Sequence, residues 1–219
     1  MKSVSAILLG AGESKRMGGN KLALPWGRET VIEHSLHTLL RSKVREVVVV
    51  VGPHTQGMMR EAKDPRVKIV VNPQFAKGMS TSIRKGILAA DRLSSGILIA
   101  LGDQPFLHPR TVNALLRAFT RGRGALIVPV FKGHRGHPVL FHRRYIPELL
   151  ALKRDVGGRS ILERNSEDVF EVCTKSPGVV KDLDTREDYE KELRKKEGGL
   201  KIRGKTKKNL RCWGQTCKG

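Results

Sequence analysis

The feature that most constrains the fold is an alternation of short apolar runs with longer stretches of helical spacing. The runs are rich in Val, Ile and Leu, mostly continuous, and lie at residues 3–9, 46–51, 67–71, 96–101 and 125–130. Continuous apolar character is typical of strands buried on both faces of a parallel sheet. Helices are predicted between them, at residues 30–42, 54–63, 79–92 and 109–121. This order predicts a three-layer α/β sandwich with a mostly parallel sheet.

The pattern changes after Val130. A polar loop at 132–136 precedes a run at 138–141 that is long enough for one extra strand, and the run is followed by helical segments at 144–153 and 158–164. A strand is predicted at 169–174 and a closing helix at 185–196. We expect the part after Val130 to form a small insertion that covers the substrate side of the sheet. At the first helix, Thr30 and Glu33 have the spacing of a capping box.

The chain has 219 residues and a formal net charge of +21, much of it beyond Lys191. We predict one domain over residues 1–197 and a basic, disordered tail over 198–219. The tail has no aromatic stacking pattern or nucleic-acid motif, so the charge does not by itself indicate nucleic-acid binding. The rest of the chain is also basic, which suits small polyanionic substrates.

No apolar run approaches the roughly 18 residues that a membrane span requires. The apolar run at 4–9 ends in a glycine loop rather than a cleavage site, so we read it as a strand and place the protein in the cytoplasm. Cys173 falls in a predicted strand and is expected to be buried. Cys212 and Cys217 form a lone pair in the tail, which does not indicate zinc.

The loop after the first run reads LGAGESKRMGGNK, from Leu9 to Lys21. Its glycines let backbone N–H groups approach phosphate oxygens, and Lys15, Arg16 and Lys21 add positive charge. A dinucleotide fingerprint fails because Lys15 replaces the third glycine, and no stretch supplies a P-loop. The loop therefore predicts a site that wraps a triphosphate.

A second group of candidates is acidic. Asp103 follows the buried run at 96–101, which is where α/β sheets place ligands. Its carboxylate is a natural ligand for Mg²⁺, which proteins hold with one or two carboxylates plus substrate phosphates. Asp182 and Asp184 follow the last predicted strand, and either can be the second ligand. Asp184 can instead cap the closing helix.

The segment NPQFAKGMSTS, from Asn72 to Ser82, also follows a strand and opens a helix. In one interpretation Ser80 or Ser82 caps that helix. In the other, Gly78 and the serines bring backbone and hydroxyl groups to a base or a ribose.

Together these segments resemble the molybdenum cofactor cytidylyltransferases, within the wider class of GT-A-like nucleotidyltransferases with a Rossmann-like sheet. The motifs follow the family's order and cover nearly everything up to about residue 190. They are LGAGESKRMGGNKLALPWG at 9–27, NPQFAKGMSTSIRKG at 72–86, GDQP at 102–105, GHPVLF at 136–141, GGRSIL at 157–162 and DLDTREDY at 182–189.

The resemblance implies that the terminal phosphate of molybdopterin attacks the α-phosphate of CTP and releases pyrophosphate. It implies that Asp103 and Asp184 bind Mg²⁺ and that Arg16 and Lys21 stabilise the triphosphate. Nucleotide binding is implied for Leu9, Ala11, Gly12, Lys21, Asn72, Gly78, Ser80 and Ser82. An anionic attacking phosphate needs positioning and charge neutralisation more than a protein base, which fits the absence of an obvious catalytic nucleophile.

The histidines divide into two groups. His137 lies in the GHPVLF motif and is expected to contact the pterin-bearing acceptor, whereas His134 and His137 together do not make a convincing zinc pair. His34 and His37 are expected on a helix surface.

Several alternatives stay open. The loop departs from the family's usual L-A-A-G start, and Arg16-Met17-Gly18-Gly19 also occurs in the related guanylyltransferases, so GTP can be the donor. The acceptor can instead be a sugar or polyol phosphate. A non-enzymatic protein that carries the cofactor to an apo-molybdoenzyme is the remaining possibility.

The domain assignment can be tested by truncation. Since the predicted chemistry lies before residue 190, we expect removal of residues 199–219 to leave the transfer rate within about twofold of the full chain. The rate of pyrophosphate release measures this. A fall of about tenfold or more would show that the tail takes part in the reaction.

Overall fold

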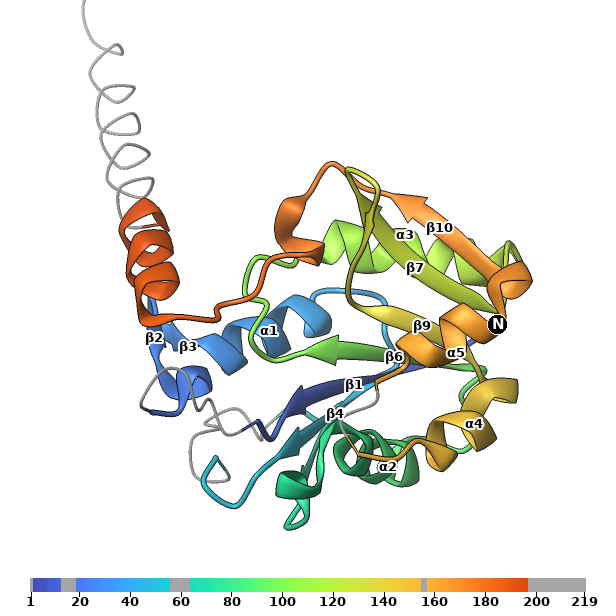
Figure 1. The fold of residues 1–219 in the computed structure, drawn as a ribbon, viewed down its shortest axis with the longest axis horizontal. Coiled ribbons are helices and arrows are strands. Elements are labelled where there is room, and N and C mark those ends of the chain that lie inside the picture. Colours follow the sequence, from blue (N-terminus) through green and yellow to red (C-terminus); the bar gives the residue numbers. More distant parts are fainter. Residues whose placement is uncertain (1, 13–18, 56–63, 155–156, 197–219) are drawn as a thin grey trace, which may run out of the picture.

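The structure is a computed structural model that describes residues 2–12, 19–55, 64–154 and 157–196. The main sheet follows the order β10-β7-β9-β6-β1-β4-β5, with β8 paired to β7 (Figure 1). Its strands are β1 (Val4–Gly10), β4 (Glu46–Val51), β5 (Val67–Val71), β6 (Gly96–Leu101), β7 (Leu126–Phe131), β8 (His134–Arg135), β9 (Val139–His142) and β10 (Val169–Cys173). A second, two-stranded sheet joins β2 (Pro25–Trp26) to β3 (Glu29–Thr30).

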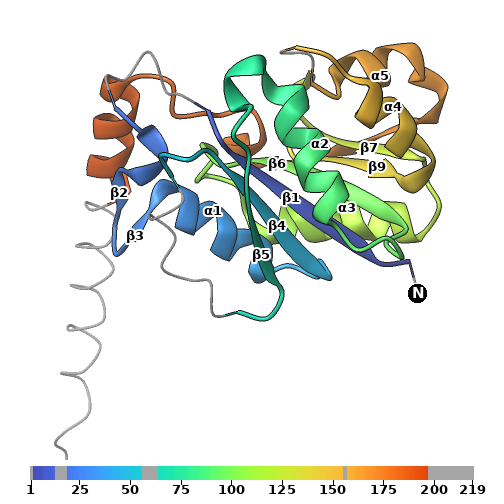
Figure 2. The same ribbon diagram turned by 90° about the horizontal axis from the view of Figure 1, so that it is seen from below.

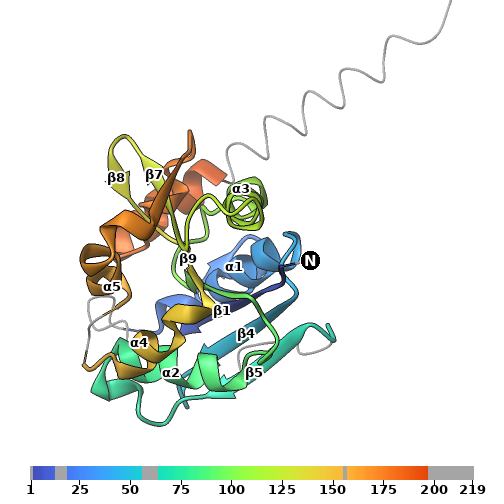
Figure 3. The same cartoon turned by 90° about the vertical axis from the view of Figure 1, so that its right-hand side faces the viewer.

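Helices cover both faces of the main sheet, as predicted. They are α1 (Val31–Leu40), α2 (Met79–Ala89), α3 (Pro109–Thr120), α4 (Ile146–Ala151) and α5 (Arg159–Arg164), and residues 186–196 are also helical. Figure 3 shows α1 and α3 on one side of the sheet and α2, α4 and α5 on the other. The result is the expected three-layer sandwich.

The buried strands explain why the sequence pattern is continuous. In β4, Val47, Val49 and Val51 belong to the core under α1 and α3, whereas Val48 and Val50 belong to the core under α2. All five valines are fully buried. Successive side chains of a strand point to opposite faces, so a strand covered on both sides must be apolar at every position.

Most elements lie within a few residues of their predicted bounds. The capping box of α1 is present: the Glu33 N–H donates to the Thr30 hydroxyl at 3.3 Å, and the Thr30 N–H donates to Glu33 Oε2 at 2.8 Å. The predicted helix at 54–63 falls mostly outside the described residues, as does the predicted tail at 198–219. No helix of the described part is long and apolar enough to cross a bilayer.

The chain after Val130 does more than cover the sheet. β9 enters the sheet between β6 and β7 and runs antiparallel to both. α4 then packs on α2. Of the predicted loop at 132–136, residues 132–133 form the turn after β7 and residues 134–135 form β8. The segment therefore supplies a central strand together with α4 and α5 on the α2 face of the sheet (Figure 2).

The expectation that Cys173 is buried is wrong. Cys173 ends β10, which is the edge strand of the sheet, and its side chain is exposed. An edge strand is covered less completely than a central one, so a position in a strand does not by itself give burial.

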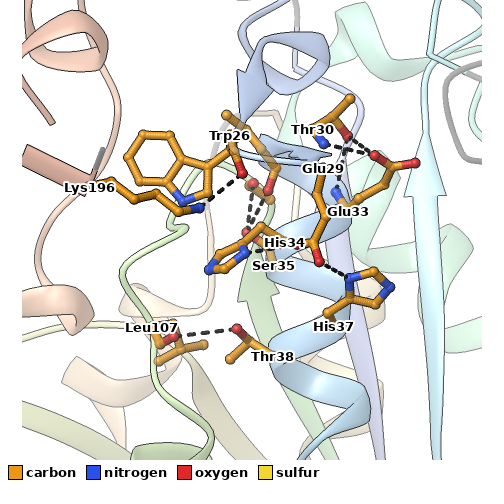
Figure 4. A network of polar contacts seen from close by, with 12 residues as sticks. Trp26, Glu29, Thr30, Glu33, His34, Ser35, His37, Thr38, Leu107 and Lys196 are labelled. Atoms are coloured by element: carbon orange, nitrogen blue, oxygen red, sulfur yellow. Dashed lines mark hydrogen bonds and ion pairs between the residues drawn. The ribbon is translucent and has the colours of Figure 1, made fainter. Parts of the chain in front are cut away.

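The expectation that His34 and His37 are surface residues of a helix is met only in part, because they lie on α1 but are not fully exposed. Both are partly buried, and the Nδ1 atom of each lies 2.9 Å from a different oxygen of the Glu29 carboxylate (Figure 4). Burial lowers the pKa of His34, against the opposing effect of its hydrogen bond with Glu29. Burial also acts to raise the pKa of Glu29, but the hydrogen bonds from the two histidines outweigh it and lower that pKa. Glu29 therefore fastens the small β2–β3 sheet to α1.

This contact predicts a pH dependence of stability. A histidine with a lowered pKa in the folded state binds fewer protons than in the unfolded chain, so stability falls as the pH drops below about 6.5, through the folded pKa. We expect His34→Asn to reduce that fall by at most about 1.4 kcal/mol per pH unit. Denaturant unfolding between pH 7 and pH 5 measures it. His134→Asn, at an exposed position of β8, is the control, and an unchanged pH slope in His34→Asn would contradict the prediction.

A close contact between α5 and β9 predicts a second effect. A Cβ atom on Gly158 would lie 2.4 Å from the Cζ atom of buried Phe141, whereas one on Gly157 would lie 3.3 Å from the flexible thioether of Met79. Because Gly158 has αR geometry, only the lack of space opposes a side chain there. We expect Gly158→Ala to lower the free energy of unfolding by about 1–3 kcal/mol.

Gly157→Ala is the matched control for this substitution. It should change the free energy of unfolding by about 0.5 kcal/mol or less, because the Met79 side chain can move aside. Equal effects of the two substitutions would contradict the packing argument.

Candidate active site

Two loops meet at the carboxyl ends of β1 and β6, which are adjacent parallel strands (Figure 1). The Gly102 N–H donates to the Leu9 carbonyl at 2.9 Å, which holds the start of the second loop against the end of β1. A Cβ atom on Gly102 would lie 2.9 Å from that same carbonyl oxygen, so the approach requires glycine. The strand order therefore brings Lys21 and Asp103 together.

Lys21 is the centre of this group. It begins a 3-10 helix at Lys21–Ala23, which Asn20 caps by accepting a hydrogen bond from the Leu22 N–H at 3.1 Å. The Lys21 ammonium lies 2.6 Å from Asp103 Oδ2 and 3.7 Å from Asp184 Oδ1. Three segments far apart in the sequence thus share one cation between two carboxylates.

Asp182, Gln104 and His137 adjoin this group. The Gln104 side-chain amide donates to Asp182 Oδ1 at 2.6 Å. Burial raises the pKa of Asp182, and the nearby charges of Asp103 and Asp184 raise it further. Burial lowers the pKa of His137, although the carboxylates of Asp182 and Asp103 oppose that shift. His137 is therefore held neutral close to the carboxylates.

A cavity of about 530 Å³ opens beside His137. Its inner wall is apolar and is formed by Ile83, Ile99, Leu101, Val128, Phe141 and Leu162. Charged and polar groups of His134, Arg135, Arg159 and Glu163 also line it, with Arg159 paired to Glu163 at 2.9 Å and Arg135 paired to Glu171 at 2.8 Å. A cavity of this size with an apolar wall and a few charged groups suits a small organic ligand.

A smaller cavity of about 210 Å³ lies at the carboxyl ends of β1 and β4, between the glycine loop and the end of β4. The loop contributes Ala11 and Gly12, as the sequence predicts, together with Gly19 and Asn20. His54 and Phe75 form the opposite wall, with ring centroids 5.8 Å apart in an edge-to-face arrangement.

The sequence reasoning missed this second wall, which is formed by Gly52, His54, Thr55 and Phe75. The signal was available, because β1 and β4 are adjacent parallel strands and Gly52-Pro53 directly follows β4. Loops at the same edge of neighbouring parallel strands face one another.

Four of the expected nucleotide-binding residues gather elsewhere, at the start of α2. Fully buried Asn72 donates from its side-chain amide to the hydroxyls of Thr81, at 2.9 Å, and Ser82, at 3.0 Å. Neither serine caps the helix, because its N-cap is Gly78, at a φ of 110°, with no side-chain cap hydrogen bond. Ser80 is buried and donates its N–H to the Arg154 carbonyl. Arg16 lies outside the described residues.

The carboxylate oxygens of Asp103 and Asp184 are suitable ligands for Mg²⁺. The described residues contain no group of three His, Cys, Asp or Glu side chains placed to hold a metal ion. Mg²⁺ does not need such a group, since it takes one or two carboxylates and fills its other positions with water and substrate phosphates. The carboxylates of Asp103 and Asp184 lie 2.6 Å and 3.7 Å from the Lys21 ammonium, so both face the same cation position.

Comparison with known proteins gives relatives across most of the chain. A protein of Paenarthrobacter nicotinovorans named nicotine blue oxidoreductase is 34% identical over 194 residues, covering 84% of this chain and 93% of that protein. The molybdenum cofactor cytidylyltransferase of Escherichia coli K12 is 25% identical over 189 residues, covering 86% of this chain and 95% of that protein.

Solved structures agree with the fold. The crystal structure of a Mycobacterium tuberculosis protein homologue, from Mycobacterium sp. strain JC1, superposes with a TM-score of 0.77 at 26% identity, covering 89% of this chain and 98% of the other. A family model described as the MobA-like NTP transferase domain matches residues 6–169, a range that holds both the glycine loop and Asp103. The chain therefore belongs to the family of the MobA-like NTP transferase domain.

Proposed function

We propose that this chain transfers a nucleotidyl group, CMP from CTP, to the terminal phosphate of molybdopterin and releases pyrophosphate. The observation that carries the proposal is the Lys21 ammonium between Asp103 and Asp184, at the carboxyl edge of the sheet and adjoining two cavities of different size. The relative named molybdenum cofactor cytidylyltransferase supports the choice of CTP and of the pterin acceptor.

The nucleotide occupies the smaller cavity in this proposal. Its base lies between Ala11–Gly12 and the His54–Phe75 pair, and the volume of the cavity suits a single base. The triphosphate follows the glycine loop toward Lys21, with Arg16 as a further cation. Leu9 lies at the end of β1. Asn72, Gly78, Ser80 and Ser82 lie at the start of α2, outside the lining of this cavity, so they have no contact with the base in this proposal.

Asp103 and Asp184 would hold Mg²⁺, which neutralises phosphate charge when bound. Lys21, which now pairs with both carboxylates, then contributes its charge to the triphosphate and the leaving pyrophosphate. A fixed cation in a partly buried place stabilises developing negative charge more strongly than water does. Asp182 is turned to Gln104 and is assigned no ligand role.

The acceptor occupies the larger cavity. Its ring system packs on the apolar wall at Ile99 and Phe141. Arg135 and Arg159, which pair with Glu171 and Glu163, would exchange these partners for its negative charge. His137 has a lowered pKa and is neutral, so its imidazole can accept or donate a hydrogen bond at the acceptor without changing the local charge.

The reaction itself is a displacement at phosphorus. An oxygen of the acceptor phosphate forms a bond to the α-phosphorus of CTP, and the bond to the β-phosphate oxygen breaks. The attacking oxygen is already ionised, so the protein has no proton to remove and acts by orientation and charge stabilisation. We place the activity in the cytoplasm, with delivery of the product to an apo-molybdoenzyme.

Three other functions fit parts of the same site. A guanylyltransferase would use the same charged side chains and metal, with guanine in place of cytosine in the nucleotide. A sugar or polyol-phosphate nucleotidyltransferase would differ only on the acceptor side. A carrier that delivers the cofactor without reaction would need the cavities but not the carboxylates.

One assay separates these functions. The protein is incubated with Mg²⁺ and each nucleoside triphosphate in turn, together with molybdopterin (with or without molybdenum) or with a sugar phosphate, and pyrophosphate is measured. We expect release with CTP. Release with GTP alone would indicate the guanylyltransferase, and release only with a sugar phosphate would indicate the sugar or polyol-phosphate nucleotidyltransferase. No release with any combination would overturn the proposal.

Substitution of Asp103 tests the role of the carboxylates. We expect Asp103→Ala and Asp103→Asn to lower kcat by at least about 10²–10³-fold, the usual cost of losing one preorganised charge-stabilising group. Asp64→Asn, at an exposed ion pair with Arg66, is the matched control and should keep full activity. Turnover in Asp103→Asn at the rate of the control would show that Asp103 is not part of the chemistry.

A further inference from the structure

The segment that carries Asp184 is tied to the loop that carries Asp103 by two hydrogen bonds. The Leu183 N–H donates to the Asp103 carbonyl at 3.1 Å, and the Gln104 side-chain amide donates to Asp182 Oδ1 at 2.6 Å. The donors and acceptors are residues 103 and 104 on one side and residues 182 and 183 on the other. We call Lys21, Asp103 and Asp184 the ion group. Each of the two hydrogen bonds therefore lies next to a carboxylate of the ion group.

Gln104 is almost wholly enclosed. Its side chain is 3% exposed, and its Oε1 atom is buried and accepts no hydrogen bond from the described residues. A buried amide that leaves one polar atom unpaired costs free energy, so packing alone does not favour glutamine here. Its single side-chain hydrogen bond is to a carboxylate, and such charge-assisted bonds are short and strong.

Asp182 and Asp184 face different surroundings. One oxygen of Asp182 is occupied by Gln104, in a partly buried position. The Asp184 side chain is 45% exposed and faces Lys21. Fully buried Leu183 separates the two and anchors the backbone between them. Of the two carboxylates, Asp184 is the one open to an exchangeable cation.

We propose that Gln104 and Asp182 are positioning residues, whose hydrogen bond holds the 182–184 segment so that Asp184 faces Asp103 across the cation site. The inference rests on the proposed function, because it assigns Asp184 and not Asp182 as the metal ligand. Partners outside the ligand set that orient a metal ligand commonly change metal affinity by about 10–100-fold when they are removed.

The test uses a pair of substitutions with equal charge. Asp182→Asn and Asp182→Leu both remove the carboxylate, but only Asn keeps an oxygen that can accept from Gln104. Gln104→Leu breaks the same bond with no change of charge, and Asp184→Asn removes the proposed ligand itself. The affinity of each full-length variant for Mn²⁺ alone is measured by electron paramagnetic resonance.

We expect Asp182→Asn to bind Mn²⁺ within about threefold of the wild type, and Asp182→Leu and Gln104→Leu to bind at least about tenfold more weakly. The double variant with both leucines should be no weaker than either single one, because the two residues share one bond. Asp182→Asn as weak as Asp182→Leu would show that the charge of Asp182 acts directly, and would overturn the proposal.

An unchanged affinity in Gln104→Leu, or no Mn²⁺ binding by the wild type, would also overturn it. Thermal unfolding checks that the leucine variants fold. If Gln104→Leu does not fold, Gln104→Ala is used in its place to remove the hydrogen bond to Asp182. Because Mn²⁺ binding needs neither nucleotide nor acceptor, the two proposals fail separately. Loss of binding in Asp184→Asn without pyrophosphate release by the wild type would refute the proposed reaction and leave the positioning role standing.

Discussion

The arrangement of the site depends on one interaction, the Lys21 ammonium between the carboxylates of Asp103 and Asp184. The two carboxylates are only partly buried, but they still repel each other, and a cation between them offsets that repulsion. Lys21 supplies that cation within the chain itself. Its partners come from the ends of two different segments of the fold, so the interaction forms only when β1, β6 and the 182–184 segment are all in place.

Each of these segments has its own support. The Ser35 hydroxyl on α1 donates to the Gly102 carbonyl at 3.0 Å. The Thr38 hydroxyl lies 3.4 Å from the Leu107 carbonyl (Figure 4), so α1 holds both ends of the loop that carries Asp103. The helix after Asp184 is tied to the β2–β3 sheet, where the Tyr189 hydroxyl donates to the Pro25 carbonyl and Lys196 donates to the Trp26 carbonyl. The packed elements thus hold the loop with Asp103 and the segment with Asp184 in place, and these in turn position the two carboxylates.

The sequence predicted the parts of this structure that depend on burial from both sides. The runs that became β4, β5 and β6 were located to the residue, because a strand between two helical layers is apolar throughout. The four-residue run of β9 carried no information on direction, so its antiparallel place at the centre of the sheet was not foreseen. The departures at Cys173 and His34 have a common cause: burial there depends on which neighbour lies opposite, and a local pattern does not contain that neighbour.

The residues of the candidate site also divide into those that the sequence pattern predicted and those that it did not. Lys21 and Asp103 were predictable as partners because each follows a strand whose apolar character marks it as central, whereas Phe75 and His54 gave no chemical signal of their own. The ion group and the larger cavity also draw on different parts of the chain, since much of the cavity wall comes from residues 133–163. Substitutions in that wall can change the shape of the acceptor site while Lys21, Asp103 and Asp184 keep their contacts. A fold of this kind can therefore change the molecule it acts on without rebuilding its charged centre.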